Sequence, residues 1–228
     1  MELLKQFIYN FDAEMLLLLV LSLLASMLCI MVHELSHALA ALSLGDSTAK
    51  RLGRLSLNPL SHIDPIGFLM LVVARVGWAK PVPIDIRSFR HPKRDMALTA
   101  FAGPLSNFLL AIAAVFAAGI IHANAHGIIW AYVVYFLCYV CVLSVGLGLF
   151  NLIPIPPLDG SKLLFSLLPE RLYNGYLCYE RYLLVVVVAL AWFGVFSGPL
   201  GTGISWTIRA ICDVFDFPFE YFSYYFGL

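Results

Sequence analysis

The chain alternates long apolar runs with short polar segments. The first apolar run extends from Met15 to Val32, and the others cover about 96–121, 127–150 and 182–196. A helix needs about 20 mostly apolar residues to cross the hydrocarbon core of a bilayer. The pattern therefore predicts about four full transmembrane helices, the first covering about 13–44 and stopping at Gly45.

A shorter apolar segment, residues 68–76, follows the first predicted span and is too short to cross a bilayer. Basic residues stand on both sides of it, and the prolines of Trp78-Ala-Lys-Pro-Val-Pro83 exclude a regular helix. Irregular backbone is not tolerated against lipid, so we expect this region to face protein or a water-filled cavity. The pattern predicts a re-entrant or β-hairpin segment between the first two spans.

The C-terminal part differs in pattern from the spans before it. Three glycines and a proline within Gly198–Gly203 predict a flexible turn. Beyond this turn, charged residues recur at helical spacing between residues 209 and 220, and Pro218 must bend any helix there. These features favour an interfacial helix over another crossing.

The composition places the chain in a membrane. Apolar residues make up 61% of it and charged residues 12%, whereas a soluble domain is about half apolar and a quarter charged. The formal net charge is zero, so nothing indicates a nucleic-acid partner. Cys138 and Cys141 have the spacing of a metal or redox pair, but they lie within an apolar run, which favours apolar packing. We predict an all-α polytopic membrane protein.

A polar motif interrupts the end of the first apolar run. His33 and His37 are four residues apart and would lie on one face of a helix, with Glu34 between them in sequence. Two imidazoles so placed can bind one Zn²⁺, and the Glu can activate a water molecule. A chance match is the alternative. Because ionisable groups at membrane depth are costly and usually functional, we favour a metal site.

Catalytic zinc usually has three protein ligands, and a second polar interruption lies far along the chain. This segment, Asn151-Leu-Ile-Pro-Ile-Pro-Pro-Leu-Asp159-Gly160, follows the third predicted span. With both motifs, the chain resembles the site-2 proteases, zinc metalloproteases that cleave substrates within the membrane. Three further segments resemble that family in the expected order: residues 54–67, 78–83 and 102–107.

The resemblance implies a site and an activity. Asp159 is expected to be the third zinc ligand beside His33 and His37, and Glu34 the general base. The chain would be one integral-membrane protease domain over residues 1–228, without a PDZ or CBS domain. Its catalytic core would cover about 13–168 and its accessory C-terminal helices 177–228. The expected substrate is a transmembrane protein with helix-weakening residues near the cut, and the expected location is the cell membrane, as a multi-pass protein in the lipid bilayer. A homo-oligomer is left open.

Two asparagines have alternative interpretations. Asn151 matches the family position of an oxyanion donor, and the alternative is a cap that satisfies backbone groups freed by Pro154. Asn107, an isolated polar residue at membrane depth, would contact substrate or the site, or would make a hydrogen bond between helices. For the whole chain, the alternatives are a non-proteolytic zinc protein, which would not need Glu34, and a metal transporter, for which the sequence shows no repeated halves.

The basic residues predict an orientation. Eight Lys and Arg residues lie in the two segments that flank the short apolar stretch, between residues 50 and 94. By the positive-inside rule, both segments are expected in the cytoplasm. The N-terminus and the loop His122–His126 would then lie outside. The two histidines of that loop are expected to be solvated rather than metal-bound.

Overall fold

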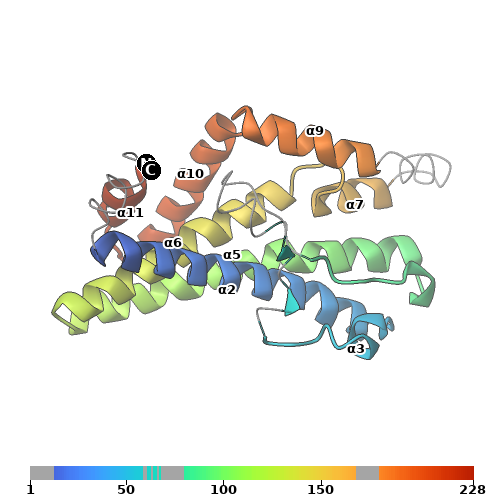
Figure 1. The fold of residues 1–228 in the computed structure, drawn as a ribbon, viewed down its shortest axis with the longest axis horizontal. Helices are drawn as coiled ribbons and strands as arrows, with labels where there is room; N and C mark the ends of the chain where they lie inside the picture. Colours follow the sequence, from blue (N-terminus) through green and yellow to red (C-terminus); the bar gives the residue numbers. More distant parts are fainter. Residues whose placement is uncertain (1–12, 59–60, 63, 66, 68–79, 168–179) are drawn as a thin grey trace, which may run out of the picture.

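The computed structural model describes residues 13–58, 61, 62, 64, 65, 67, 80–167 and 180–228, and this part of the chain contains helices and no β-strand. The described residues form seven α-helices of more than one turn, one short helix and one 3₁₀ turn, arranged as Figure 1 shows. They are α2 (Ala13–Ser43), α3 (Thr48–Arg51), η2 (Ile86–Ser88), α5 (Pro92–Asn124), α6 (Ile128–Asn151), α7 (Asp159–Ser166), α9 (Glu180–Trp192), α10 (Ser197–Phe215) and α11 (Glu220–Phe226). The all-helical prediction is confirmed for this part, whereas the re-entrant or β-hairpin segment falls mainly on residues 68–79, outside it.

Within the described residues, three helices are long and apolar enough to cross a membrane, namely α2, α5 and α6. A fourth crossing is formed if Val185–Trp192 and Ser197–Phe215, which meet at 79°, count as one broken span. The prediction of about four spans agrees with this count. The first span ends as expected, because α2 stops at Ser43 and Gly45 follows with a φ of +109°.

The second span begins earlier than the apolar pattern indicated. Pro92 occupies the start of α5, where its missing N–H costs nothing. The Asp95 side chain accepts a hydrogen bond of 3.0 Å from the backbone N–H of His91, just before the helix. Polar residues therefore form the first turn of α5, and hydropathy alone could not detect it.

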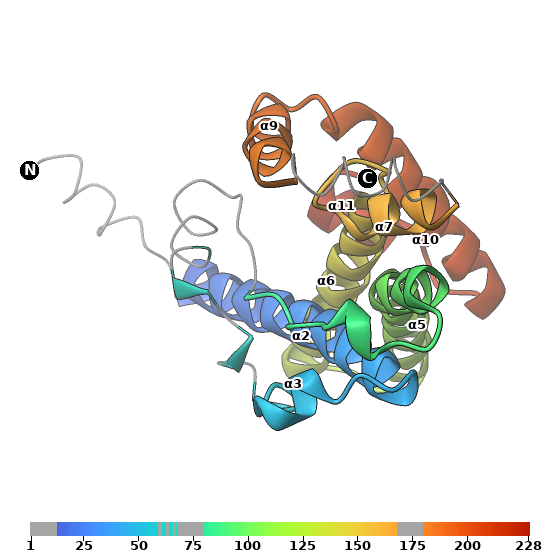
Figure 2. The same cartoon turned by 90° about the vertical axis from the view of Figure 1, so that its right-hand side faces the viewer.

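The core lies between α2, α5 and α6, which pack against one another. Helices α9 and α10 lie on the far side of α6 from α3 (Figures 1 and 2). Small residues are buried on both α2 and α5 and allow neighbouring helices to approach closely. They include Ala25, Cys29, Ala38, Ala41, Ala111, Ala114 and Ala118. Among the described cysteines, Cys138 and Cys141 are buried as free thiols in the apolar core, as predicted.

The predicted turn at Gly198–Gly203 is wrong, because these residues form the start of α10. Pro199 stands in the first turn, where a helix needs no backbone donor. The turn lies earlier, between Trp192 and Ser197, and Gly194 adopts a φ of +71° there. The glycine that makes the bend was hidden inside an apolar run.

The C-terminal tail, residues 197–228, forms two helices, α10 and α11. They lie on either side of Pro218, in agreement with the predicted bend. Its charged residues between 209 and 220 are exposed, whereas Ile208 and Phe222 are fully buried against the core. The interfacial placement of this tail stays a prediction.

The basic segments near α3 and the start of α5 lie at one end of the bundle, and the loop between α5 and α6 lies at the other (Figure 1).

Candidate metal centre

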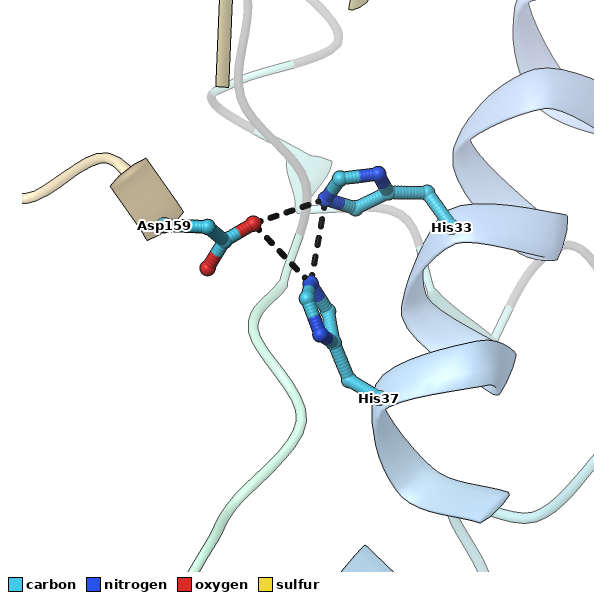
Figure 3. Close-up of side chains that lie close together, drawn as sticks. All are labelled: His33, His37 and Asp159. Atoms are coloured by element: carbon cyan, nitrogen blue, oxygen red, sulfur yellow. Dashed lines mark hydrogen bonds and ion pairs between the residues drawn. The ribbon is translucent and has the colours of Figure 1, made fainter. Parts of the chain in front are cut away.

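Three buried side chains from two helices converge on one point (Figure 3). On α2, His33 and His37 bring their Nε2 atoms to 3.1 Å from each other. Asp159, the first residue of α7, places Oδ2 at 3.2 Å from His33 Nε2 and 3.1 Å from His37 Nε2. The structure thus brings together the three residues that the sequence proposed as ligands, and this is the one such group of His, Cys, Asp or Glu among the described residues.

The chain between α6 and α7 delivers Asp159 to this point. Pro154, Pro156 and Pro157 prevent α6 from continuing, since each lacks the backbone donor a helix needs. The chain then turns back, and Gly160 packs directly on the end of α6. A Cβ atom at Gly160 would lie 2.2 Å from the carbonyl oxygen of Leu152, so only glycine fits. The Asp-Gly pair therefore combines a donor group with a close backbone approach.

The three donor atoms fit a zinc ion. With bonds of about 2.0–2.1 Å, the ligand atoms of a tetrahedral zinc site lie about 3.3–3.4 Å from each other. The three distances in this site are 3.1–3.2 Å, so an ion would enter with small shifts. Two imidazoles and one carboxylate also form a typical three-ligand set for catalytic zinc.

In each imidazole, a proton on Nδ1 leaves Nε2 of the neutral ring free to bind a metal. His37 Nδ1 lies 2.8 Å from the carbonyl oxygen of Thr99, which can only accept, so Nδ1 donates and Nε2 of the neutral ring keeps its lone pair. The Asn107 amide nitrogen lies 3.2 Å from His33 Nδ1, while Asn107 Oδ1 is buried without a partner among the described atoms. Rotating this amide by 180° pairs Oδ1 with a His33 Nδ1–H and frees Nε2. The orphaned oxygen therefore fits a metal-binding tautomer of His33.

A glycine on α5 makes room for both imidazoles. A Cβ atom at Gly103 would lie 2.4 Å from His37 Nε2 and 2.7 Å from His33 Cε1. The sequence analysis did not identify this role. The signal was present, however, because Gly103 and Asn107 are four residues apart and lie on one face of α5.

Glu34 is not one of the three side chains in this group. Its Oε2 accepts a hydrogen bond of 3.0 Å from the backbone N–H of Val82, and the side chain lines a cavity of about 510 Å³ together with His33 and His37. Lys162, which the sequence analysis did not single out, also lines this cavity and donates to Asp159 Oδ1 over 3.3 Å. The cavity therefore gives access to the whole group of polar side chains.

Asn151 lines the same cavity, at the C-terminal end of α6. Its Nδ2 donates to the carbonyl oxygen of Leu147, one turn earlier in that helix, over 3.0 Å. The geometry thus places Asn151 beside the candidate centre, with its side-chain amide bonded to a backbone carbonyl of its own helix. Asn107 joins the site through His33, and this contact is also a hydrogen bond between helices.

These features define a class of protein, a polytopic membrane protein with a buried His₂Asp centre and an adjacent glutamate. The sequence profile of peptidase family M50 matches residues 117–194. The chain is 38% identical to the "Putative zinc metalloprotease YwhC" of Bacillus subtilis over 77% of its own length and 79% of that protein. The chain belongs to peptidase family M50, the site-2 proteases, and is a zinc metalloprotease.

Two more distant relatives have related names. Rip2 of Mycobacterium tuberculosis, strain H37Rv, has the same descriptive name as YwhC and is 27% identical over 81% of this chain and 69% of its own length. The "Regulator of sigma-E protease RseP" of Escherichia coli is 42% identical, over 28% of this chain and 16% of that protein. No solved structure matches the chain significantly.

Proposed function

We propose that this zinc metalloprotease hydrolyses peptide bonds within or near the transmembrane helices of membrane-protein substrates. The observation that carries the proposal is the position of the candidate centre within α2. His33 is ten residues from the end of a helix apolar enough to cross a membrane. At a rise of about 1.5 Å per residue, this places the centre about 15 Å from that end. The chemistry would therefore take place at membrane depth.

His33, His37 and Asp159 would hold the zinc ion. When bound, Zn²⁺ supplies Lewis-acid chemistry, because it polarises a carbonyl oxygen and lowers the pKa of a water molecule. The Thr99 carbonyl and the Asn107 amide orient the two imidazoles. Lys162 binds Asp159 Oδ1 and so leaves Oδ2 for the ion.

Glu34 would move the proton during hydrolysis. Its carboxylate accepts a proton from the attacking water and then delivers it to the leaving amine, which is general base and general acid catalysis by one residue. Because Glu34 is not among the three grouped donors, its removal should leave them in place. Asn151 would donate a hydrogen bond to the oxygen that becomes negatively charged, after its amide turns away from Leu147.

The substrate must be unwound before it is cut. Peptide carbonyls in a helix are already hydrogen bonded, so the scissile bond must leave the helix to reach the centre. The accessory C-terminal helices contribute to the space that receives it, because Val187 and Val188 of α9 form part of the cavity wall. We expect a multi-pass enzyme of the cell membrane that acts on substrates in the same bilayer.

A reconstituted cleavage assay tests this function. Purified protein in lipid vesicles is expected to cut at least one member of a panel of single-span proteins that carry helix-weakening residues. A chelator should abolish cleavage, and added Zn²⁺ should restore it. Mass spectrometry of the products locates the cut. Cuts confined to the water-exposed flanks of every substrate would contradict an intramembrane activity.

Asn151 offers a second test, which separates its two interpretations. If Asn151 is an oxyanion donor, Asn151→Ala should lower turnover by about 10²–10³-fold with zinc content unchanged. If it is only a cap, the same change should cost about 1 kcal/mol of stability and leave turnover nearly normal. Asn151→Asp sharpens the contrast, since a carboxylate still caps but repels the developing charge. Near wild-type turnover in both variants would assign Asn151 a structural role.

A further inference from the structure

An extended segment, Lys80–Asp85, passes beside the candidate catalytic base. We call it the active-site strap. Pro81, Val82 and Ile84 of the strap line the same cavity as the metal-ligand group. The backbone N–H of Val82 donates to Glu34 Oε2 over 3.0 Å. The strap therefore contacts the base through its main chain.

The sequence of the strap leaves one donor at this point. Val82 stands between Pro81 and Pro83, and neither proline has a backbone N–H. Within this tripeptide, only the Val82 N–H can therefore bind the carboxylate. A hydrogen bond to an ionised acceptor is roughly twice as strong as one between neutral groups. The Val82 N–H holds one carboxylate oxygen of Glu34, and the other oxygen is left to exchange a proton.

The Arg54 side chain also binds the strap, through backbone carbonyl groups. Its side chain is only 9% exposed, and its Nη2 donates to the carbonyl oxygens of Lys80 at 2.7 Å and Pro81 at 3.4 Å. The other terminal nitrogen donates to the carbonyl oxygen of Ser61. The guanidinium thus binds the carbonyl groups that immediately precede the Val82 N–H.

Two further contacts fix the strap at its ends. The Lys80 N–H donates to the carbonyl oxygen of His62 over 2.9 Å. The Asp85 N–H donates over 2.7 Å to Oδ2 of Asp46, which is fully buried just after α2. The strap is anchored on both sides of Val82. Arg54, Ser61 and His62 thus meet Lys80 and Pro81 in this network, and the zinc chemistry does not explain these contacts.

We propose that Arg54 and Val82 are positioning residues, which act together to orient Glu34 for proton transfer. This inference rests on the proposed role of Glu34 as the base. A carboxylate held by a fixed donor is preorganised, so less reorientation is needed when the proton moves. Arg54 acts at a distance, through the backbone of the strap, and does not contact the reacting atoms.

A matched pair of variants at residue 82 tests the proposal. Val82→Pro removes the N–H and keeps an apolar side chain, whereas Val82→Ala keeps the N–H and removes packing. Val82→Pro is expected to lower kcat by about 10–100-fold, the usual cost of removing a supporting contact, with KM and zinc content unchanged. Val82→Ala should lower kcat clearly less than Val82→Pro does, because the N–H that binds Glu34 remains. A raised KM with normal kcat would assign the strap to substrate binding and overturn the proposal, as would equal losses in both variants.

Arg54 variants provide the second arm and do not depend on the folding of Val82→Pro. Arg54→Met should lower kcat to a similar extent, and Arg54→Lys, which can still reach one carbonyl group, should recover part of the loss. Because both changes act through one contact, the double variant Arg54→Met, Val82→Pro should be no slower than the slower single variant. Fully additive losses would show that the two residues act independently, contrary to the proposal.

Hydrogen exchange supplies a readout that needs no cleavage. The Val82 amide should exchange slowly in the wild-type protein and faster in Glu34→Ala and in Arg54→Met. Equal exchange in wild type and Glu34→Ala would exclude the Val82 contact and overturn the positioning inference, whatever the activity. If the wild type cuts no transmembrane substrate although this protection is present, the proposed function fails and the contact stands.

Discussion

Replacement of Glu34 by glutamine is expected to abolish cleavage and to leave the zinc content unchanged. Glutamine has the same shape but cannot take up the proton that the reaction must move, and general acid–base catalysis contributes about 10²–10⁴-fold to a rate. Zinc should remain, since the proposed ligands are His33, His37 and Asp159, the three side chains grouped in the structure. Metal analysis of the purified protein and the vesicle assay together measure both properties.

His33→Ala is the matched control for Glu34→Gln, because it removes a proposed ligand one residue away. It should lose zinc and cleavage together. Absence of zinc from Glu34→Gln would show that Glu34 is a ligand and would contradict the assignment. Retained cleavage in zinc-loaded Glu34→Gln would require another base.

Addition of one methyl group at Gly103 is expected to remove the metal. The new Cβ of Gly103→Ala would lie 2.4 Å from His37 Nε2, and real Cβ contacts are not that short. Both imidazoles would have to move, and their nitrogens would no longer surround one point together with Asp159. We expect zinc affinity to fall by at least about 10–100-fold, with loss of cleavage. Competition with a chelator of known affinity measures the change.

Gly119→Ala is a control on the same helix. Among the described residues, a Cβ atom at Gly119 would meet only Phe217, at an ordinary distance of 3.9 Å. This variant should therefore keep zinc and activity while making the same chemical change in α5. If Gly103→Ala binds zinc as tightly as Gly119→Ala does, the packing of Gly103 under the imidazoles is not required for the site.

The spacing of residues along the chain was enough to predict part of the site. His33 and His37 could be paired from the sequence because helical periodicity puts residues four apart on one face, and the structure shows their Nε2 atoms 3.1 Å apart. Asp159 lies 126 residues from His33, and no local rule links the two. Its place in the group was an expectation from family resemblance, and the geometry agrees with it.

The roles of Gly103 and Val82 were not predicted from the sequence. The effect of Gly103 depends on side chains of another helix, and the effect of Val82 on a backbone N–H, which every non-proline residue has. The bend before α10 was misplaced for a different reason. Gly194 lies within an apolar run, whereas the glycines at 198–203 resemble a turn and are nevertheless accommodated in a helix. Long-range contacts decide the effects of Gly103 and Val82, whereas the position of the bend depends on which glycine adopts a positive φ.

The separation of the ligands along the chain has a consequence for the assembly of the protein. An ion bound to α2 and to α7 acts as a cross-link that closes a loop of more than a hundred residues, which contains α5 and α6. A ligand that binds only the folded state stabilises it by about 2.7 kcal/mol when present at a hundred times its dissociation constant. Zinc would thus hold the start of α7 against α2 and help to keep the third span in register. Metal supply to the membrane would then govern how much assembled protein exists, in addition to how fast it works.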